Sequence, residues 1–358
     1  MHRTTTRRLV ALATVGLSLT AAGCGSSSSS SADTAAATTA AADTTAAAPS
    51  GDLPDTITIG YQLVPNGDLV VKHEGLLEKA FGPNVKIEWK VFDSGGSVNE
   101  AVVAGGVDFG LVGSSPTSRG ISTGIEYQVP WIFDVIGKAE ALVVKGDKGI
   151  TSVADLKGKT IATPFASTSH YSLLAALEDA GLSDSDVNVI DSEPDAILAA
   201  WQAGQIDGAY VWNPNLAKLV ADNGKVLVTS EDLSKEGKTT YDLAIVTNDF
   251  ASKYPAAVQT WVEQEDAAVK QIRKDPTTAA ADIAAELDIT PAEAADQLSQ
   301  LIFLDASEQV GADYLGGGLA TNLFKAAQFN QKLGKIDTVQ AESAYQNAVV
   351  TTFAAAVK

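Results

Sequence analysis

The stretch VFDSGGSVNEAVVAGGVDFGLVGSSP at residues 91–116 returns in altered form as VIDSEPDAILAAWQAGQIDGAYVWNP at residues 189–214. Both copies carry an Ala-Gly pair and a closing Pro, and Asp108 of the first corresponds to Asp207 of the second. Each copy has the pattern of a strand end, a short helix and a buried strand that runs into a polar loop. Because the correspondence spans so many positions at an offset of 98 or 99 residues, it predicts two lobes with the same local fold.

Strand and helix patterns also alternate on the N-terminal side of both copies. The strand-like stretch TITIGYQ (56–62) and a helix pattern over 69–80 precede the first copy. The stretch KTIATPF (159–165) and a helix pattern over 170–182 precede the second. Each set completes a βαβαβ unit, which favours a parallel sheet with helices on its faces. The predicted fold class is therefore α/β with two lobes.

Two extended segments connect the predicted lobes. They are PWIFDVIGKAEALVVKG (130–146) and TTYDLAIVTNDF (239–250), and two such crossings are typical of a hinge. Beyond the second crossing the pattern is almost entirely helical, and we expect helices at 312–333 and 337–357 to cover the first lobe. The predicted boundaries are 55–139 for lobe 1, 140–241 for lobe 2, and 242–358 for the return to lobe 1 and the C-terminal helices.

The first 54 residues are expected to lie outside this fold. Residues 1–23 carry three Arg, an apolar run at 9–19 and then small residues, which is the layout of a signal peptide. The run is too short for a stable membrane-spanning helix. Cys24 resembles the lipidated cysteine of bacterial lipoproteins, although Ala21 stands where that motif usually has Leu. The alternative is a cysteine left beside an ordinary cleavage site.

The Ser/Thr/Ala-rich stretch 24–54, which begins with the lipid-anchored Cys, is typical of a flexible linker. Signal, anchor and linker together predict that the folded part is extracytoplasmic. We expect it to be lipid-anchored to the cell membrane, on its periplasmic side or outer face.

Composition argues against several classes of function. The 358 residues include 44 acidic and 25 basic ones, for a net charge of −19. Loss of the signal peptide leaves 22 basic residues and a net charge of −22. Such a surface repels nucleic acid and anionic lipid, so we expect no nucleic-acid partner and membrane contact only through the anchor.

The residue types that catalysis and metal binding require are also scarce. One Cys and 3 His exclude a Cys/His zinc site within one chain, and no G-x-S-x-G motif is present. We therefore expect no catalytic residues, no metal, no cofactor and no enzyme activity, and we expect a monomer.

Polar residues follow three predicted strands at the edge where open α/β sheets bind ligands. They are the stretches 113–116 (GSSP), 167–170 (STSH) and 212–214 (WNP). The first two begin predicted helices, where free backbone N–H groups and the positive end of the helix dipole meet. With the added hydroxyls, these helix starts would form an anion receptor. One N-cap explains one hydroxyl, whereas three in a row with a counterpart in the other lobe favour ligand binding.

Carboxylates are predicted on the other side of the same cleft. Asp242 lies within YDLAIV and Glu140 within KAEALVV, and a carboxylate in a buried strand is costly unless it is paired. Anion donors facing carboxylates suit a small zwitterion, and the alternative for each acid is a structural salt bridge across the hinge. His170 is open as a catalytic base, a core histidine or a ligand donor, with a structural or ligand-contact role favoured. Tyr210 and Trp212 either line the cleft or belong to the core.

Several motifs together resemble one protein family. FDSGGSV, VGSSP, KAEALVVK, PFASTSHYSLLAAL, AAWQAGQIDGAYVWNP and TTYDLAIV are similar to the taurine-binding proteins of ABC importers, within the wider group of sulfonate, nitrate and taurine solute-binding proteins. The resemblance runs from about Thr56 to Asp249. It implies a two-lobed periplasmic-binding-protein fold (type II-like) that closes on taurine and delivers it to a membrane permease driven by an ATPase.

The resemblance also implies roles for single residues. The hydroxyls at the two helix starts would hold a sulfonate. Asp242, with Glu140, would hold an ammonium group, and Gln62 would contact the ligand from the end of the first strand. Tyr210 and Trp212 would border the pocket. The predicted ligand-binding residues are Gln62, Ser114, Ser115, Glu140, Ser167, Thr168, Ser169, His170, Tyr210, Trp212 and Asp242, and the predicted lipidation site is Cys24.

Two departures from that family leave the ligand open. Ala244 stands where taurine binders carry a bulky aromatic, and the stretch 63–68 (LVPNGD) also differs. The alternative ligands are aliphatic sulfonates or another small zwitterion or quaternary amine such as glycine betaine. An enzyme is a third alternative, since thiamine-pyrimidine synthases resemble this fold, but a cysteine-rich motif marks them and this chain has only Cys24. The last alternative is a sensor that reports bound ligand to a membrane receptor.

Overall fold

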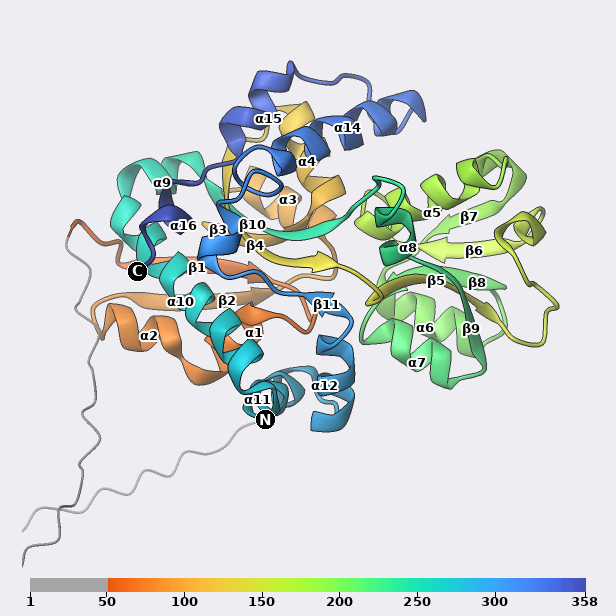
Figure 1. Cartoon of the computed structure of the whole chain (residues 1–358), viewed down its shortest axis with the longest axis horizontal. Helices are drawn as coiled ribbons and strands as arrows, with labels where there is room; N and C mark the ends of the chain where they lie inside the picture. The colour runs from red at the N-terminus through yellow and green to blue at the C-terminus, as the bar shows by residue number, and fades with distance from the viewer. Residues whose placement is uncertain (1–50) are drawn as a thin grey trace, which may run out of the picture. The chain divides into compact units, whose positions relative to one another are not determined.

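The computed structural model describes residues 51–358, which fold into two α/β lobes, each built on its own sheet (Figure 1). The predicted signal peptide, Cys24 and nearly all of the predicted linker lie outside the described residues. Among residues 51–358, no helix combines the length and the apolar character needed to cross a membrane.

Lobe 1 contains a six-stranded mixed sheet. Its strands are β1 (Thr56–Tyr61), β2 (Lys86–Val91), β3 (Phe109–Gly113), β4 (Tyr127–Ile136), β10 (Tyr241–Thr247) and β11 (Leu301–Ile302). They lie in the order β11-β4-β10-β3-β1-β2. β1 is parallel to both β2 and β3, whereas β10 is antiparallel to β3 and β4, and β11 to β4. The parallel part is the predicted βαβαβ unit.

Helices cover both faces of this sheet (Figure 1). Those within the first unit are α1 (Gly67–Glu74), α2 (Leu76–Phe81), α3 (Gly95–Val103) and α4 (Ser114–Thr123). Those after the return are α9 (Asn248–Lys253), α10 (Pro255–Lys274), α11 (Pro276–Leu287), α12 (Pro291–Leu298), α13 (Ala306–Gln309), α14 (Gly318–Lys332), α15 (Glu342–Ala348) and α16 (Thr352–Ala356).

Lobe 2 repeats the plan on a five-stranded sheet in the order β7-β6-β8-β5-β9. Its strands are β5 (Glu140–Lys145), β6 (Thr160–Thr163), β7 (Asn188–Asp191), β8 (Gly208–Trp212) and β9 (Gly224–Thr229). Its helices are η1 (Val153–Leu156), α5 (Thr168–Asp179), η2 (Asp184–Asp186), α6 (Pro194–Gln202), α7 (Asn215–Ala221) and α8 (Ser230–Ser234). β6 is parallel to β7 and β8, and β5 is antiparallel to β8 and β9.

The sequence repeat is also a structural repeat. In lobe 1, the Asp108 carboxylate accepts a hydrogen bond of 2.8 Å from the backbone N–H of Thr58 in β1. In lobe 2, the Asp207 carboxylate accepts one of 3.0 Å from the N–H of Thr160 in β6. Each Asp therefore ties the chain entering the third strand to the first strand of its unit. The prediction of two lobes with the same local fold is confirmed.

An aromatic cluster joins the longest helix to the sheet of lobe 1. Trp261 of α10 stacks on Phe109 of β3, with ring centroids 4.9 Å apart. It also meets Phe133 of β4 edge-on at 5.9 Å. Aromatic side chains bury about 150–250 Å² each, so these rings contribute strongly to the core. They fix the positions of the strands whose far ends reach the cleft.

Strand β5 of lobe 2, which lies between β8 and β9, is buried on both faces, as expected where helices cover both sides of a sheet. Ala141 and Val143 belong to one apolar cluster and Leu142 and Val144 to the sheet's opposite one. Glu140 begins this strand and is itself fully buried. A buried carboxylate therefore lies at the start of an apolar strand.

The chain passes from lobe 1 to lobe 2 between β4 and β5, and it returns between α8 and β10. The two crossings contact each other, because the Ile136 N–H donates to the Thr240 carbonyl at 3.0 Å. The Lys138 N–H donates to the Gln300 carbonyl at 3.0 Å, so the residues before β11 brace the first crossing. The two crossing segments predicted from the sequence are confirmed.

The C-terminal helices were expected to cover lobe 1, and α14 does so but also contacts lobe 2. α14 packs against α4 of lobe 1, yet its last turn also reaches lobe 2. Phe329 meets Tyr171 of α5 edge-on, with ring centroids 5.0 Å apart, and Lys335 pairs with Asp184 at 2.7 Å. No local sequence pattern indicates such a contact, because its partners lie more than 150 residues apart in the chain.

A buried pair of carboxyl groups, Asp68 of α1 and Glu265 of α10, joins two helices of lobe 1. Both side chains are buried, and no donor elsewhere in the described chain bonds to their carboxyl oxygens. Burial raises the pKa of Asp68 to about 7, and burial together with the Asp68 charge raises the pKa of Glu265 well above its usual range. The pair therefore retains a proton at neutral pH that the unfolded chain has lost.

This pair predicts that stability falls as the pH rises through about 7. A raised folded-state pKa means that the folded protein binds more protons than the unfolded chain, so raising the pH favours unfolding. In Glu265→Gln the amide can donate to the Asp68 carboxylate, and we expect the loss between about pH 6 and pH 8 to become smaller. Urea unfolding at the two pH values measures this loss of stability. Glu263→Gln, on the exposed face of the same helix, is the matched control, and an equal change in both variants would contradict the prediction.

Candidate functional site

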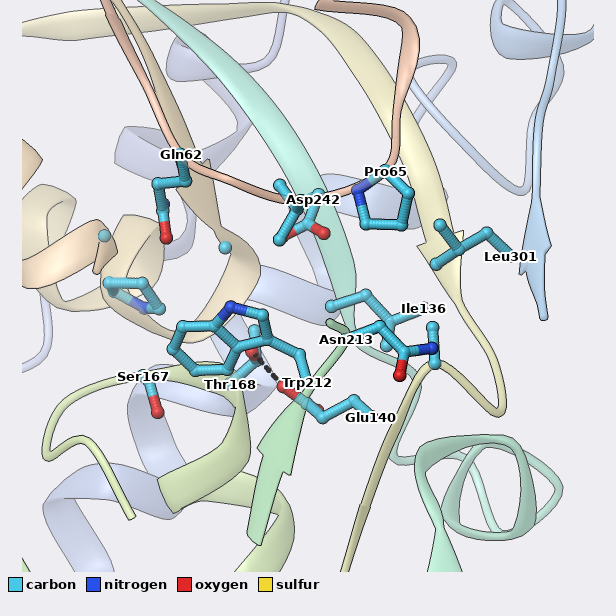
Figure 2. A pocket seen from close by; sticks show the side chains of 15 residues that line it. Gln62, Pro65, Ile136, Glu140, Ser167, Thr168, Trp212, Asn213, Asp242 and Leu301 are labelled. Carbon is cyan, nitrogen blue, oxygen red and sulfur yellow. Dashed lines mark hydrogen bonds between the residues drawn. The ribbon is translucent and has the colours of Figure 1, made fainter. Parts of the chain in front are cut away.

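A cavity of about 30 Å³ lies between the two lobes, at the carboxyl ends of β1 and β3 and of β8 (Figure 2). This is the sheet edge predicted to bind ligand. From lobe 1 and its C-terminal segments it is lined by Gln62, Val64, Pro65, Gly95, Gly113, Pro116, Ile136, Asp242 and Leu301. From the first crossing and lobe 2 it is lined by Ala139, Glu140, Ser167, Thr168, Trp212 and Asn213. No Lys, Arg or His is among these lining residues.

Six of the predicted ligand-binding residues line this cavity: Gln62, Glu140, Ser167, Thr168, Trp212 and Asp242. Asp242 and Glu140 reach it from different lobes (Figure 2). Asp242 keeps part of its surface open, whereas Glu140 is buried. Burial and the nearby Glu140 charge raise the pKa of Asp242 to about 7. The site therefore combines two carboxyl groups with no positive side chain to neutralise them.

Glu140 is surrounded by hydroxyl groups. It accepts hydrogen bonds from Thr168 Oγ1 at 2.6 Å, Ser169 Oγ at 2.8 Å and Ser230 Oγ at 2.7 Å, with Ser172 Oγ at 3.4 Å. Burial raises the pKa of the Glu140 carboxyl, while these four donors lower it. The network holds Glu140 in one position at the start of β5.

This network changes the expected role of the α5 hydroxyls. The protons of Thr168 and Ser169 are donated to Glu140, so they do not point at an anion in the cavity. Ser167 Oγ donates to the Pro164 carbonyl at 2.6 Å and accepts from the His170 N–H at 3.1 Å. In this conformation Ser167 is an N-cap, as in the alternative considered above. An anion at this helix start would be held by the free backbone N–H groups of the first turn.

The remaining predicted residues lie behind the cavity wall. Ser114 Oγ accepts from the Tyr241 N–H at 3.2 Å, and Ser115 Oγ accepts from Asn330 Nδ2 at 3.5 Å. Tyr210 is fully buried in lobe 2, with its hydroxyl 3.2 Å from the Ser230 hydroxyl. These side chains support the helix starts and the Glu140 network. The residues predicted to contact ligand that do not line the cavity are Ser114, Ser115, Ser169, His170 and Tyr210.

His170 supports the loop between β6 and α5. Its ring stacks on Phe165, with centroids 4.4 Å apart and planes 6° apart. Its Nδ1 accepts a hydrogen bond of 3.2 Å from the Ala166 N–H. Burial, with the charges of Lys335 and Arg119, lowers the pKa of His170 to about 4. A neutral ring held in this way matches the structural role that was left open for His170.

Leu301 and Asp134 were not predicted from the sequence, and Asn213 was named only as part of the polar strand end 212–214. Leu301 comes from the two-residue strand β11, which is too short to produce a periodic pattern. Asn213 Nδ2 donates to Gln300 Oε1 at 3.0 Å, so β8 and the segment before β11 meet beside the cavity. Asp134 is fully buried on β4 directly opposite Asp242. Its position inside the apolar run WIFDVI carried the same signal that singled out Asp242.

Comparison with known proteins supports the resemblance seen in the sequence. The chain is 42% identical over 207 residues to a taurine-binding periplasmic protein of Escherichia coli (strain K12), an alignment that covers 58% of this chain and 63% of that relative. The chain thus spans less than two thirds of the length of that curated relative.

Solved structures share the fold. The periplasmic aliphatic sulphonate-binding protein of Escherichia coli superposes with a TM-score of 0.67 at 25% identity, over 82% of this chain and 92% of that one. A desulfurization enzyme superposes with a TM-score of 0.60 at 17% identity, over 84% of this chain and 99% of that one. At that identity the second likeness shows the fold alone. The fold is the two-lobed periplasmic-binding-protein fold, as predicted.

The family assignment rests on a longer stretch of sequence than the alignment with the taurine-binding relative. Residues 50–288, which include both βαβαβ units, both crossings and most of the cavity lining, match the model of the NMT1-like family. The chain belongs to the NMT1-like family.

Proposed function

We propose that this protein is an extracytoplasmic solute-binding protein that captures taurine and delivers it to an ABC importer. The observation that carries the proposal is the polarity of the cavity. Asp242 and Glu140 supply negative charge and two helix N-termini supply positive potential. Among the described residues, no cationic side chain lines the space between them. The sequence similarity to a taurine-binding protein supports the same ligand.

Taurine matches this polarity group by group. Its ammonium group donates to carboxylate oxygens, and each such charge-assisted hydrogen bond contributes about 1.5–3 kcal/mol. Its sulfonate stays ionised at physiological pH and needs donors only. The first-turn N–H groups of α4 and α5 supply those donors without a lysine or arginine.

The cellular setting of the proposal comes from the sequence and the relatives. The signal peptide, lipidation of Cys24 and the linker would place the two lobes outside the cytoplasmic membrane. The partners we propose are a membrane permease and its ATPase, and we propose a monomer without enzyme activity. We place the lobe boundaries at 139/140 and 241/242, because β4 ends at Ile136 in one sheet and β5 begins at Glu140 in the other.

An aliphatic sulfonate without an amino group is the second candidate. It is supported by the structural similarity to the aliphatic sulphonate-binding protein of Escherichia coli. Such a ligand would leave Asp242 and Glu140 without a cationic partner in a closed cleft. Buried carboxylates without partners are costly. The two acids therefore favour a ligand that carries a positive group.

Calorimetric titration with taurine, ethanesulfonate and glycine betaine tests the proposal. Ethanesulfonate lacks the amino group, so we expect it to bind at least about 10- to 100-fold more weakly than taurine. Glycine betaine has a cation without N–H donors, and we expect it to bind more weakly as well. Equal affinity for taurine and ethanesulfonate would refute the role of the carboxylates, and absence of taurine binding would refute the ligand.

A further inference from the structure

The cavity has a third carboxyl group behind its wall. Asp134 on β4 and Asp242 on β10 are direct partners across an antiparallel pair of strands. Residues paired in this way project to the same face of the sheet, with Cβ atoms about 4.5–5.5 Å apart. Asp134 is fully buried, and neither of its carboxyl oxygens has a hydrogen-bond partner in the described chain.

Within residues 51–358, no positive charge compensates that of Asp134. The charges that act on it are those of Asp242 on β10 and Glu140 on β5. The residues of β11, which flanks β4 on its other side, are Leu301 and Ile302 and carry no charge.

The ionisable groups on the helices that pack against β4 have other partners. On α10, Asp266 bonds to Lys270 and to the Ala306 N–H, and Glu265 faces Asp68. On α15, the Tyr345 hydroxyl lies 2.7 Å from Ser122 Oγ. On α9, Asp249 is exposed to solvent. None of these groups offsets the charge of the carboxyl pair.

Two neighbouring carboxyl groups in such a place cannot both stay ionised, because like charges at short range strongly favour protonation of one of them. Burial and the Asp242 charge, with that of Glu140, raise the pKa of Asp134 well above its usual range. The pKa of Asp242 is raised to about 7. The shift of Asp134 agrees with the strand pairing, whereas burial and the Glu140 charge cause that of Asp242.

We propose that Asp134 and Asp242 share one proton in the empty site and that the ammonium group of the ligand displaces it. The proton passes to solvent, so that one positive charge leaves as another enters. Asp134 is a positioning residue that acts through Asp242, since it does not line the cavity. The inference rests on the proposed function for the ligand, but the shared proton is a property of the ligand-free protein.

The exchange has a defined pH dependence. A proton and an ammonium group compete for the same pair, so taurine affinity should rise with pH up to the point at which the empty pair is ionised. Below that point we expect the Kd to increase about tenfold for each unit that the pH falls. Above it the affinity should level off.

Calorimetry of taurine binding near pH 6, in two buffers with different ionisation enthalpies, counts the protons released. The full mature chain should release about one proton per taurine. In Asp134→Asn the amide can donate to the Asp242 carboxylate, so the release should fall below that of the unmodified chain and the affinity should depend less on pH, while burial and the Glu140 charge still act on Asp242. Asp147→Asn, at an exposed position of lobe 2, is the matched control and should behave as the unmodified chain. The same proton release with and without Asp134 would overturn the inference.

Infrared spectroscopy of the ligand-free protein separates this inference from the proposed function. A protonated carboxyl group absorbs apart from a carboxylate, and the unmodified chain should show such absorption at neutral pH. Asp134→Asn should remove one part of it, and Glu265→Gln should remove the separate part due to the Asp68 pair. If taurine does not bind but Asp134→Asn still removes part of the protonated-carboxyl absorption, the proposed ligand is wrong and the shared proton is supported. If Asp134→Asn leaves the protonated-carboxyl absorption unchanged, the shared proton is refuted.

Discussion

Replacing Asp242 by Asn should weaken taurine binding on the order of 100-fold or more, because removing one partner of a buried charge pair costs about 2–5 kcal/mol. Asp242 reaches into the cavity from β10 (Figure 2), and the amide that replaces it carries no charge for the ammonium group. Ethanesulfonate should bind this variant at least as well as the unmodified chain, because Asn removes a carboxylate that this ligand leaves without a cationic partner. Calorimetric titration of both ligands with both proteins measures the difference.

The control for this variant is Asp195→Asn, an exposed carboxylate of α6 outside the cavity lining. It should leave both affinities unchanged. Thermal unfolding of Asp242→Asn without ligand should show an intact fold, because the substitution removes a negative charge beside two buried acids, Asp134 and Glu140. A uniform loss of affinity for taurine and ethanesulfonate would mean that Asp242 shapes the cleft and does not bind the ammonium group.

Replacing Gly113 by Ala should weaken taurine binding about 10- to 100-fold, because overpacking typically costs about 1–3 kcal/mol. A Cβ at Gly113 would lie 2.7 Å from Thr168 Cγ2. Gly113 ends β3 in lobe 1, whereas Thr168 begins α5 in lobe 2, so the added methyl group would push the lobes apart. The backbone at Gly113 has φ −60° and ψ 159°, which Ala adopts without strain.

A second substitution makes this prediction specific. Thr168→Ser removes the methyl group that would clash with Ala at position 113 but keeps the hydroxyl that donates to Glu140. The double variant Gly113→Ala with Thr168→Ser should therefore recover most of the taurine affinity. Small-angle scattering with taurine should show a less compact form for the single variant than for the double one. If the second substitution restores nothing, the contact between the lobes is not the cause.

The two predictions test different parts of one binding event. Asp242 supplies charge for one end of the ligand, whereas Gly113 allows the two lobes to approach each other around it. Loss of the Asp242 charge should change the preference between ligands. A bulkier residue at Gly113 should weaken the binding of every ligand that needs the closed cleft. A comparison of several ligands therefore distinguishes recognition from closure.

Several parts of the fold could be predicted from the sequence because their signals are local. The periodicity of the strands and helices and the spacing of Asp108 and Asp207 are readable along the chain. Each of these signals depends on residues close to one another in sequence or on an internal repeat. The two βαβαβ units and the two crossings follow from them. The reach of α14 into lobe 2 does not, because it depends on packing between distant segments.

The candidate site was predicted in composition more accurately than in its contacts. Polar strand ends and acids inside apolar runs predicted Glu140, Trp212 and Asp242 as site residues, and all three line the cavity. The hydroxyls of Thr168 and Ser169 were assigned to an anion, yet they donate to Glu140, which lies 28 and 29 residues away. A sequence shows that a hydroxyl is present but does not show which acceptor it faces.

By itself, the sequence determined the α/β repeat, the position of the cleft at the strand ends, the acids that face it and the family that the chain resembles. Only the tertiary structure decided which groups meet there. Strand pairing places Asp134 opposite Asp242. The hydroxyls of Thr168 and Ser169 donate to Glu140, and Leu301 lines the cavity. The physical reason is that burial, charge repulsion and hydrogen-bond direction depend on distances in space, which pairing between remote strands establishes.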